Sequence, residues 1–115
     1  MPYLYHMEEI YRISDDGKEI TFLNEKGEIH RAGDKPAVIH FKENPSGFHK
    51  DGKAIPDYDV LTRFVACDLY YHKNGKRHRD GDEPAAIYSD GTKAYYKNGK
   101  HHRDGDEPAV IWAPK

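Results

Sequence analysis

The chain has 115 residues, of which 37% are hydrophobic and 33% are charged, and this balance predicts a single domain with a thin core. Its 18 basic and 20 acidic residues leave a formal net charge of −2, so no global positive field would draw it to nucleic acid or to a membrane. The single cysteine, Cys67, excludes an internal disulfide and a cysteine-based zinc site. No apolar run approaches the roughly 18 residues of a membrane span, and the first residues lack a signal-peptide pattern. We therefore expect a soluble cytoplasmic protein without a cofactor.

A sequence repeat dominates the last third of the chain. Residues 74–87 return as residues 98–111 with an offset of 24, and residues 27–39 form a third copy two offsets upstream of 75–87. An incomplete copy, shifted by one residue, lies at 48–56. A period between 20 and 50 residues is typical of repeat architectures. We expect a single repeat domain over residues 1–115, with a capping strand at 3–13 and repeat units at about 13–38, 39–62, 63–86 and 87–112.

The sequence of the first part of the chain predicts strands joined by tight turns. Residues 3–14 alternate between apolar and polar side chains, which predicts a strand with one drier face. Asp16-Gly17 then turns the chain, because glycine accepts the positive φ that a tight hairpin needs. The return strand runs through Phe22, Lys26-Gly27 is the next turn, and a longer turn is expected at 43–47.

The region before the last two units is ambiguous. Residues 57–68 can wind into a helix that gathers four apolar side chains, but the end of the same stretch also alternates as a strand. Because residues 69–73 match the strand expected at 93–97, we favour a strand from about residue 62 onward, with a loop or one helical turn before it. The fold therefore includes at most one short helix near 57–66. The four apolar side chains of the helical alternative are Val60, Leu61, Phe64 and Val65.

The sequence pattern of each complete unit predicts a strand, a turn, a second strand and a second turn. In the last unit a strand at 85–88 reaches Asp90-Gly91, and the strand at 93–97 reverses at Asn98-Gly99. Asn-Gly between aromatic runs is a strong hairpin signal. The Gly-Asp-Xaa-Pro segment of each unit should form a bulge or short loop, because proline cannot donate to a strand ladder. We therefore predict an all-β fold, a single-layer curved antiparallel meander of repeated hairpins with about eight to ten strands.

The repeated pattern resembles a known family. Asn-Gly-Lys-Xaa-His-Arg followed by Gly and Pro-Ala, behind a Tyr-Tyr or Tyr-His pair, resembles the MORN-like repeats of bacteriophage, giant-virus and some bacterial proteins. The resemblance covers residues 13–42 and 69–112 well and 48–55 poorly. It implies a single-layer sheet of hairpins with a binding or scaffold role, as in a small phage protein that inhibits a host defence. This chain departs from the family in three acidic insertions between the Gly and the Pro, which are Asp34-Lys35, Asp82-Glu83 and Asp106-Glu107.

The His-Arg pairs recur at one position in each complete unit, which indicates a structural task. Arginine can satisfy loop carbonyls and pair with the aspartate after the glycine, and histidine can brace the neighbouring turn. In the functional alternative, Arg79 and Arg103 bind the phosphates of a nucleotide or the carboxylates of a partner. The residues assigned to the structural repeat are His30, Arg31, His78, Arg79, His102, Arg103, Gly75 and Gly99.

A metal-dependent hydrolase is the second alternative. Its ligands would come from His101, His102, Asp104 and Asp106, since imidazole and carboxylate bind transition metals. Adjacent residues of a strand point to opposite faces, however, which argues against a shared metal. No nucleophile elbow or phosphate loop is present, and the acidic and basic groups recur with the repeat rather than converging on one place. We expect neither a metal nor an enzyme.

Tyrosines interleaved with lysines and arginines predict the binding face. Tyr70, Tyr71, Tyr88, Tyr95 and Tyr96 could stack on nucleic-acid bases or form a protein-binding hot spot. The apolar end at 110–114 makes Trp112 the first candidate for a partner or homodimer contact. We expect a protein partner whose functional surface is covered, with a nucleotide or nucleic acid as the first alternative. The predicted partner-binding residues are Trp112, Tyr96, Tyr95, Tyr71, Tyr70, Arg79, Arg103 and Lys97.

Overall fold

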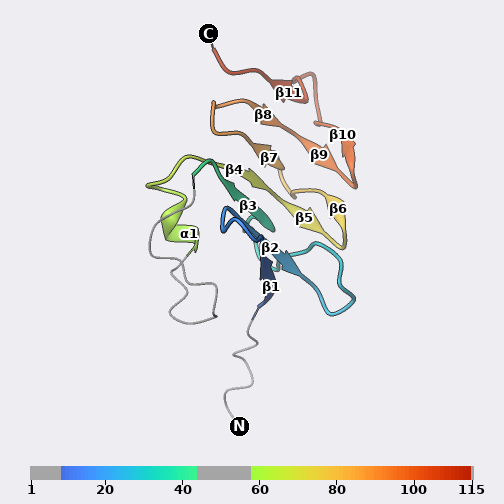
Figure 1. Cartoon of the computed structure of the whole chain (residues 1–115). Coiled ribbons are helices and arrows are strands. Elements are labelled where there is room, and N and C mark those ends of the chain that lie inside the picture. The colour runs from blue at the N-terminus through green and yellow to red at the C-terminus, as the bar shows by residue number, and fades with distance from the viewer. Residues whose placement is uncertain (1–8, 44–57, 115) are drawn as a thin grey trace.

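A computed structural model of the protein describes residues 9–43 and 58–114, which form an all-β structure with one short helix (Figure 1). The fold class expected from the sequence is therefore confirmed. Residues 3–8 of the predicted capping strand, the predicted turn after residue 43 and the incomplete copy at 48–56 lie outside the described residues.

Seven strands form one antiparallel sheet in chain order, as expected for a meander. These strands are β1 (Ile10–Ile13), β2 (Glu19–Leu23), β3 (Val38–Phe41), β4 (Cys67–Tyr70), β7 (Ala86–Ile87), β8 (Lys93–Ala94) and β11 (Val110–Ile111). Two hairpins project from this sheet as separate two-stranded sheets. They consist of β5 (His72–Lys73) with β6 (Lys76–Arg77), and of β9 (Tyr96–Lys97) with β10 (Lys100–His101). The described chain thus has eleven strands, more than we expected.

The additional strands arise because two predicted strands are each divided at a tyrosine. The strand expected at 69–73 is broken at Tyr71, whose N–H donates to the carbonyl of Ala85 at 2.7 Å while its own carbonyl accepts from the N–H of His78 at 3.0 Å. Tyr95 makes the same pair of bonds one unit later. At each tyrosine the chain leaves the main sheet and enters a projecting hairpin, which corrects the prediction of one continuous strand.

The tips of the projecting hairpins have the backbone conformation that Asn-Gly predicts. Asn74 and Gly75 have φ values of 50° and 85°, and Asn98 and Gly99 have 51° and 87°. Two consecutive positive φ values define the type I′ turn, whose twist matches that of the flanking strands. The two-residue hairpins predicted from Asn-Gly are therefore confirmed.

The helix α1 (Tyr58–Leu61) lies in the region where a short helix was expected, but the strand after it starts later than predicted. The N–H groups of Phe64 and Val65 both donate to the carbonyl of Leu61 at 3.0 Å, so residues 62–66 continue as turns. The strand β4 begins only at Cys67. The expectation of a strand from about residue 62 is therefore wrong, because these helical hydrogen bonds outcompete the weak alternation.

The main hydrophobic cluster of the described residues lies on one face of β2 and β3. Ile20, Phe22, Ile39 and Phe41 are buried there, and Leu61 and Val65 pack against them from the helical segment. Because a single-layer sheet would leave this face in water, the helical segment supplies the cover. Not all four apolar side chains expected on the helix contribute, since Val60 and Phe64 are exposed.

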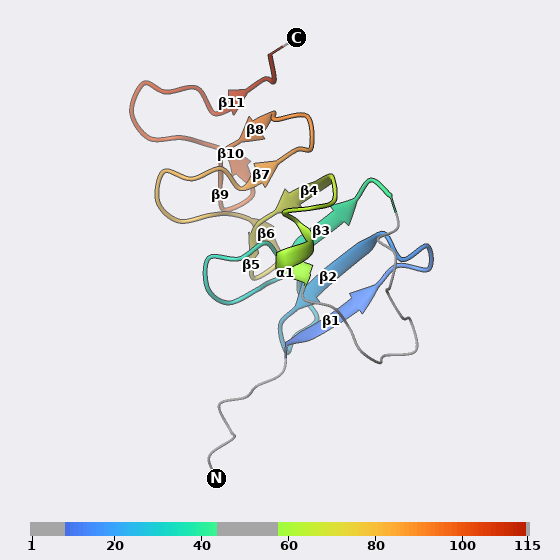
Figure 2. The same ribbon diagram turned by 90° about the vertical axis from the view of Figure 1, so that its left-hand side faces the viewer.

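Beyond the helix, arginines take over as the cover of the sheet. In each complete unit a guanidinium lies over an aromatic ring, with its carbon 3.8 to 3.9 Å from the ring centroid, and these pairs are Arg31 with Phe22, Arg79 with Tyr71 and Arg103 with Tyr95. Each arginine also donates to the carbonyl of the proline five residues later, at 3.1 to 3.3 Å. The cation thereby closes the Gly-Asp-Xaa-Pro loop over its ring, and Figure 2 shows the three loops one above another in cyan, yellow and orange-red.

The same arginines link neighbouring units. Arg79 Nε and Nη2 donate to the two carboxylate oxygens of Asp34 at 2.8 and 3.0 Å, and Arg103 binds Asp82 in the same two-pronged manner. Each aspartate follows the loop glycine of the preceding complete unit, and these hydrogen bonds hold the pKa of both carboxyls below its usual value. In the first unit Arg31 binds Glu9 and the helical Asp59 instead.

Backbone and lysine contacts also hold each projecting hairpin on the preceding complete unit. We call the set of acceptor groups that receives these hydrogen bonds the hairpin seat. Lys97 Nζ donates to the carbonyls of Arg79 and Gly81 at 2.8 and 2.9 Å, and the N–H of Asn98 donates to Nδ1 of His78 at 3.0 Å. The N–H of Gly99 also donates, to the carbonyl of Arg77. The hairpin β5–β6 is held on the first unit by the equivalent bonds. The acceptors of the two seats are Ile29 O, His30 Nδ1, Arg31 O, Gly33 O and Asp34 in the first, and Arg77 O, His78 Nδ1, Arg79 O, Gly81 O and Asp82 in the second.

We predict that Arg79→Lys lowers the free energy of unfolding by about 2 kcal/mol, because lysine keeps the charge but loses the planar fork and the stacking on Tyr71. Urea unfolding followed by circular dichroism measures the change. Arg63→Lys, at an exposed position, is the matched control and should change stability by less than about 0.5 kcal/mol. Equal losses in the two variants would show that the planar guanidinium is not what matters.

Candidate functional site

The structure divides the predicted partner-binding residues into two groups. Tyr71 and Tyr95 are buried, and Arg79 and Arg103 lie over them. Lys97 is bonded to two backbone carbonyls. These five side chains are committed to contacts within the chain, whereas Tyr70, Tyr96 and Trp112 remain as candidates for a surface site.

A row of stacked side chains runs across the unit boundary. The Arg77 guanidinium lies between the rings of Tyr70 and Tyr96, at 4.4 and 5.1 Å from their centroids. The Tyr70 ring meets that of Tyr88 edge-on at 5.7 Å, and the Tyr96 ring lies 4.5 Å from that of His101. Edge-on and offset ring pairs with an intervening cation are favourable packing geometries, so the row holds its outer members in place.

A groove of about 510 Å³ opens beside this row. Its aromatic walls are Tyr88, Tyr96 and Trp112, and Val110 and Ala94 lie between them. Ala94 pairs with Ala86 on one side and with Val110 on the other, so small side chains occupy the middle of the sheet here. The small side chain of Ala94 fills little of the space that the larger rings enclose.

The charged groups at the groove are predominantly acidic. Asp68 is buried, pairs with Lys42 Nζ at 2.7 Å and accepts from the N–H of Ser89 at 2.8 Å. Asp90 accepts from the N–H of Thr92, and this hydrogen bond lowers the pKa of the Asp90 carboxyl. Two carboxylates thus face one ammonium group, which is itself neutralised by Asp68.

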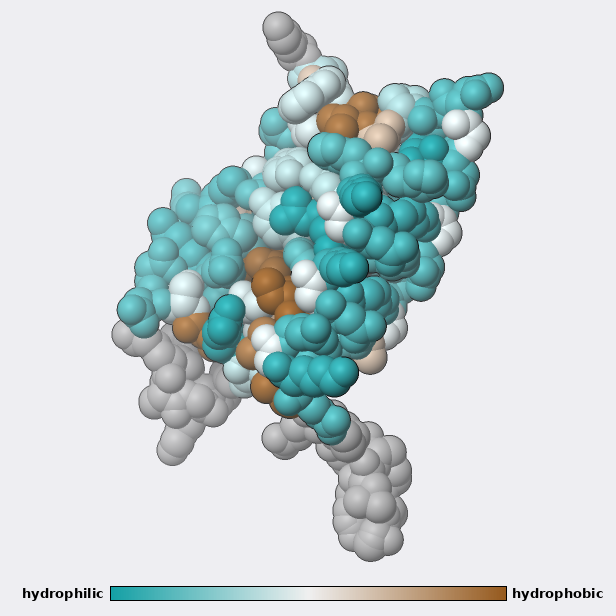
Figure 3. Space-filling view, turned by 90° about the vertical axis from the view of Figure 1, so that its right-hand side faces the viewer, coloured by the Kyte–Doolittle hydropathy of each residue, from teal (hydrophilic) through white to brown (hydrophobic). Residues whose placement is uncertain are grey.

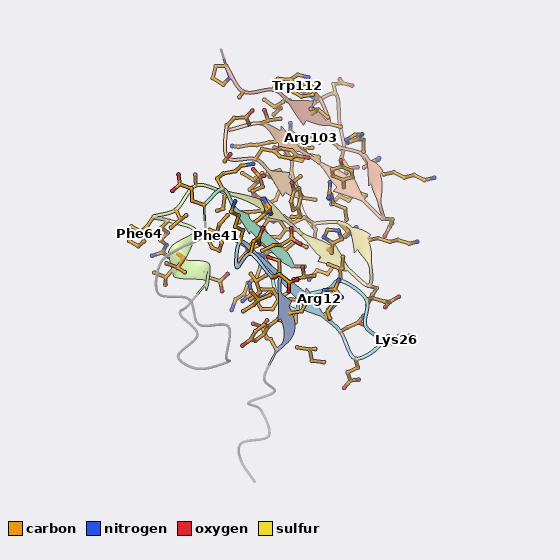
Figure 4. The ribbon with its side chains drawn as sticks, in the orientation of Figure 1. Arg12, Lys26, Phe41, Phe64, Arg103 and Trp112 are labelled. Carbon is orange, nitrogen blue, oxygen red and sulfur yellow. The ribbon has the colours of Figure 1, made fainter. Side chains whose placement is uncertain are left out.

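Trp112 stands at the rim of the groove. Trp112 is 77% exposed, and Figure 4 places it near the upper end of the sheet. The N–H of Ala113 donates to Thr92 Oγ1 at 3.0 Å, which fixes the backbone directly after the tryptophan. A large aromatic ring in water on an anchored backbone is well suited to burial against a partner.

The residues considered for a metal site do not converge. His102 Nε2 lies 2.8 Å from Asp104, whereas the His101 ring stacks on Tyr96. Within 9–43 and 58–114, no group of three or more His, Cys, Asp or Glu side chains is arranged to hold a metal ion. Cys67 is half-buried against the core, and burial raises the pKa of its thiol.

Comparison with other proteins adds no assignment. No protein-family model, no curated protein and no solved structure matches the chain. The described part of the chain contains no helix that is long and apolar enough to cross a membrane. The MORN-like resemblance stays a prediction.

Sequence reasoning missed the charged members of the groove. Lys42 and Asp68 are 26 positions apart, and the partner of Asp68 on the other side, Ser89, is 21 positions further on. No local sequence pattern predicts contacts between residues so far apart in the chain. A usable signal did exist for the walls, because Tyr88 and Trp112 occupy the same position of two units, 24 residues apart.

A half-buried histidine lies in the hairpin that carries Arg77. His72 faces Arg77 across β5–β6, and His72 Nδ1 and Arg77 Nε are both buried without a hydrogen-bond partner in the described structure. Burial, reinforced by the charge of Arg77, lowers the pKa of His72 from 6.5 to about 4. The folded protein therefore holds this imidazole neutral where the unfolded chain takes up a proton.

We predict that stability falls as the pH falls from 6.5 to about 4, because the unfolded state binds the His72 proton first. The full shift would correspond to about 3 kcal/mol, and solvent screening of this half-buried ring reduces the expected loss to about 1 to 2 kcal/mol. Urea unfolding at a series of pH values measures it. His72→Gln should flatten the curve in this window, whereas His101→Gln, which alters an exposed ring, should not. An unchanged slope in His72→Gln would refute the assignment.

Proposed function

We propose that the protein is a non-enzymatic binding module that covers a functional surface of a protein partner with its aromatic groove. The observation that carries this proposal is the exposed Trp112 on the rim of a groove walled by Tyr88 and Tyr96. Tryptophan and tyrosine dominate the binding energy of protein interfaces, and a cavity of about 510 Å³ can admit partner side chains.

The distribution of charge favours a protein over a nucleic acid. The cations that a phosphate backbone would need, Arg79, Arg103 and Lys97, are bonded within the chain. At the groove the charges of Lys42 and Asp68 neutralise each other, and the remaining carboxylate, Asp90, would repel phosphates. A partner segment with apolar and basic side chains fits this lining better.

The contacts of the acidic and basic side chains support a role without catalysis. His78 accepts from the N–H of Asn98 with one ring nitrogen and lies 2.8 Å from Asp80 with the other. Both nitrogens of His78 thus serve a structural contact, while His30 shares the contact of Nδ1, with the N–H of Asn74, and His102 shares that of Nε2, with Asp104. Groups engaged in this way do not supply the mobile proton that acid–base catalysis requires.

The resemblance to MORN-like repeats extends the proposal to a biological setting. It suggests a bacteriophage protein that inhibits a host defence in the cytoplasm by occlusion. In the alternative role predicted for Trp112, its ring is buried against a second copy of the chain in a homodimer rather than against the target. The phage setting rests on the resemblance, whereas the homodimer rests on the exposure of Trp112.

We predict that a partner captured from host lysate by the wild-type protein is lost, with binding at least about tenfold weaker, in Trp112→Ala and in Tyr96→Ala. Phe64→Ala is the matched control, because Phe64 is 78% exposed but does not line the groove. Affinity for the captured protein is then measured by calorimetry. Equal capture by wild type and both groove variants would rule the groove out as the binding surface.

The nucleic-acid alternative has a direct test, since Trp112 is the only tryptophan of the chain. We predict that single-stranded oligonucleotides and cyclic nucleotides leave the Trp112 fluorescence unchanged at physiological salt. A protein partner should shift this emission to shorter wavelength, because burial removes water from the indole. Saturable quenching by an oligonucleotide would favour nucleic acid instead.

A further inference from the structure

The last unit presents a third hairpin seat. The groups equivalent to the acceptors of the first two seats are His101 O, His102 Nδ1, Arg103 O, Gly105 O and the Asp106 carboxylate. None of these groups receives a hydrogen bond from the described part of the chain. The exposure of the histidine records this difference, since the His102 side chain is 52% exposed and that of His78, which lies under a hairpin, is 16% exposed.

This third seat already has the conformation of the two filled seats. Gly105 has a φ of 78°, against 77° for Gly81 and 78° for Gly33. Arg103 is stacked on its ring and bonded to the carbonyl of Pro108, as its counterparts are. A partner would therefore meet a preorganised surface, which reduces the loss of conformational entropy on binding.

The histidine of the third seat is also held in a suitable orientation. In the second seat the N–H of Asn98 donates to Nδ1 of His78, so the ring proton lies on Nε2, which donates to Asp80. His102 Nε2 lies at the same distance of 2.8 Å from Asp104. This contact favours the tautomer whose Nδ1 lone pair can accept from an incoming backbone N–H.

The edge of the main sheet completes the surface. The N–H of Ala85 donates to the carbonyl of Ala94, and that of Ala37 donates to the carbonyl of Tyr70. Ala109 has the same position in the last unit, next to the edge strand β11. Its N–H is available to an added strand, so the edge can be extended together with the seat.

We propose that this third seat binds a β-hairpin of the same design carried by another polypeptide segment: a Lys-Asn-Gly turn with an arginine four residues after the glycine. The complementarity is specific, because the seat offers oxygen and nitrogen acceptors and one carboxylate, and such a hairpin brings an ammonium group, two backbone N–H groups and a guanidinium. Figure 3 shows that this side of the molecule is hydrophilic over most of its area, which suits a partner held by polar contacts.

The occupant lies outside the described residues. Both described hairpins with this pattern are already bound, β5–β6 on the first unit and β9–β10 on the second. The related sequence Lys50-Asp51-Gly52 has Pro56 at the position that the arginine takes in the other copies. The seat is distinct from the aromatic groove, so this proposal stands independently of the function assigned to Trp112.

A synthetic peptide with the sequence of residues 91–107, titrated into the full-length protein by calorimetry, tests the proposal in trans. We expect saturable binding that is abolished when the peptide carries Lys97→Ala and Arg103→Ala. In the protein, Asp106→Asn should weaken binding about tenfold, because it removes the carboxylate of the seat. Glu83→Gln makes the same change of charge on an exposed side chain one unit away and should leave binding unchanged.

A second arm covers the case in which the isolated peptide does not fold. Residues 113–115 are replaced by a copy of residues 89–112, which places a further hairpin in phase with the seat. We expect a higher Tm than that of the 115-residue chain, and Asp106→Asn should lower Tm in the extended chain only. Dependence on Asp106 in either arm supports the proposal. Binding that ignores Asp106→Asn, or the absence of both peptide binding and a gain in Tm, overturns it.

Discussion

The structure depends on an arginine that satisfies three demands at once. In each complete unit the guanidinium covers an aromatic ring, closes its own loop through a prolyl carbonyl, and binds a carboxylate that comes from outside the unit. A single-layer sheet has no second layer to exclude water from its rings, so a flat cation with five donors takes that place. The hydrophobic cluster under the helical segment covers only β2 and β3, and the arginines cover aromatic rings in the later units.

The contrast between the two ends of the sheet follows from this arrangement. Arg31 binds the carboxylates of Glu9 and Asp59, which precede and follow the first loop in the sequence. At the other end Asp106 is exposed and faces no arginine of the described chain. The same chemistry therefore closes the first unit and leaves the last one open to a partner. The aromatic groove lies near this open end, where Val110 and Trp112 contribute to its lining.

The sequence predicts those parts of the fold that are decided within a few residues. Asn98-Gly99 and Asp16-Gly17 announce their turns because a positive φ is a local property, and Gly-Asp-Xaa-Pro announces a loop because proline cannot pair. The partners of the arginines, in contrast to the turns, are not decided by the local sequence. Arg79 was expected to pair with an aspartate after a loop glycine, but only the stacking of units decides that this aspartate is Asp34.

Other features escape sequence reasoning for the same reason. The break at Tyr71 results from its hydrogen bonds to Ala85 and His78, and the alternation of side chains does not indicate these partners. The groove combines Lys42 and Asp68 with rings from later units, so its charge could not be read from any single stretch. The exposure of Trp112 could be predicted from the sequence, because an apolar strand precedes it and little other apolar sequence remains to cover that strand.

The seating of each hairpin on its predecessor makes local stability unequal along the chain. The hairpin β5–β6 is held from below by the first unit and carries the second hairpin through Arg77, whereas β9–β10 is held from one side only within the described residues. In an array whose units touch only their neighbours, free energy is distributed link by link. Opening fluctuations should therefore begin at β9–β10 and reach the hydrophobic cluster of β2 and β3 last, so the amide protons of β9–β10 would exchange first and those of β2 and β3 last.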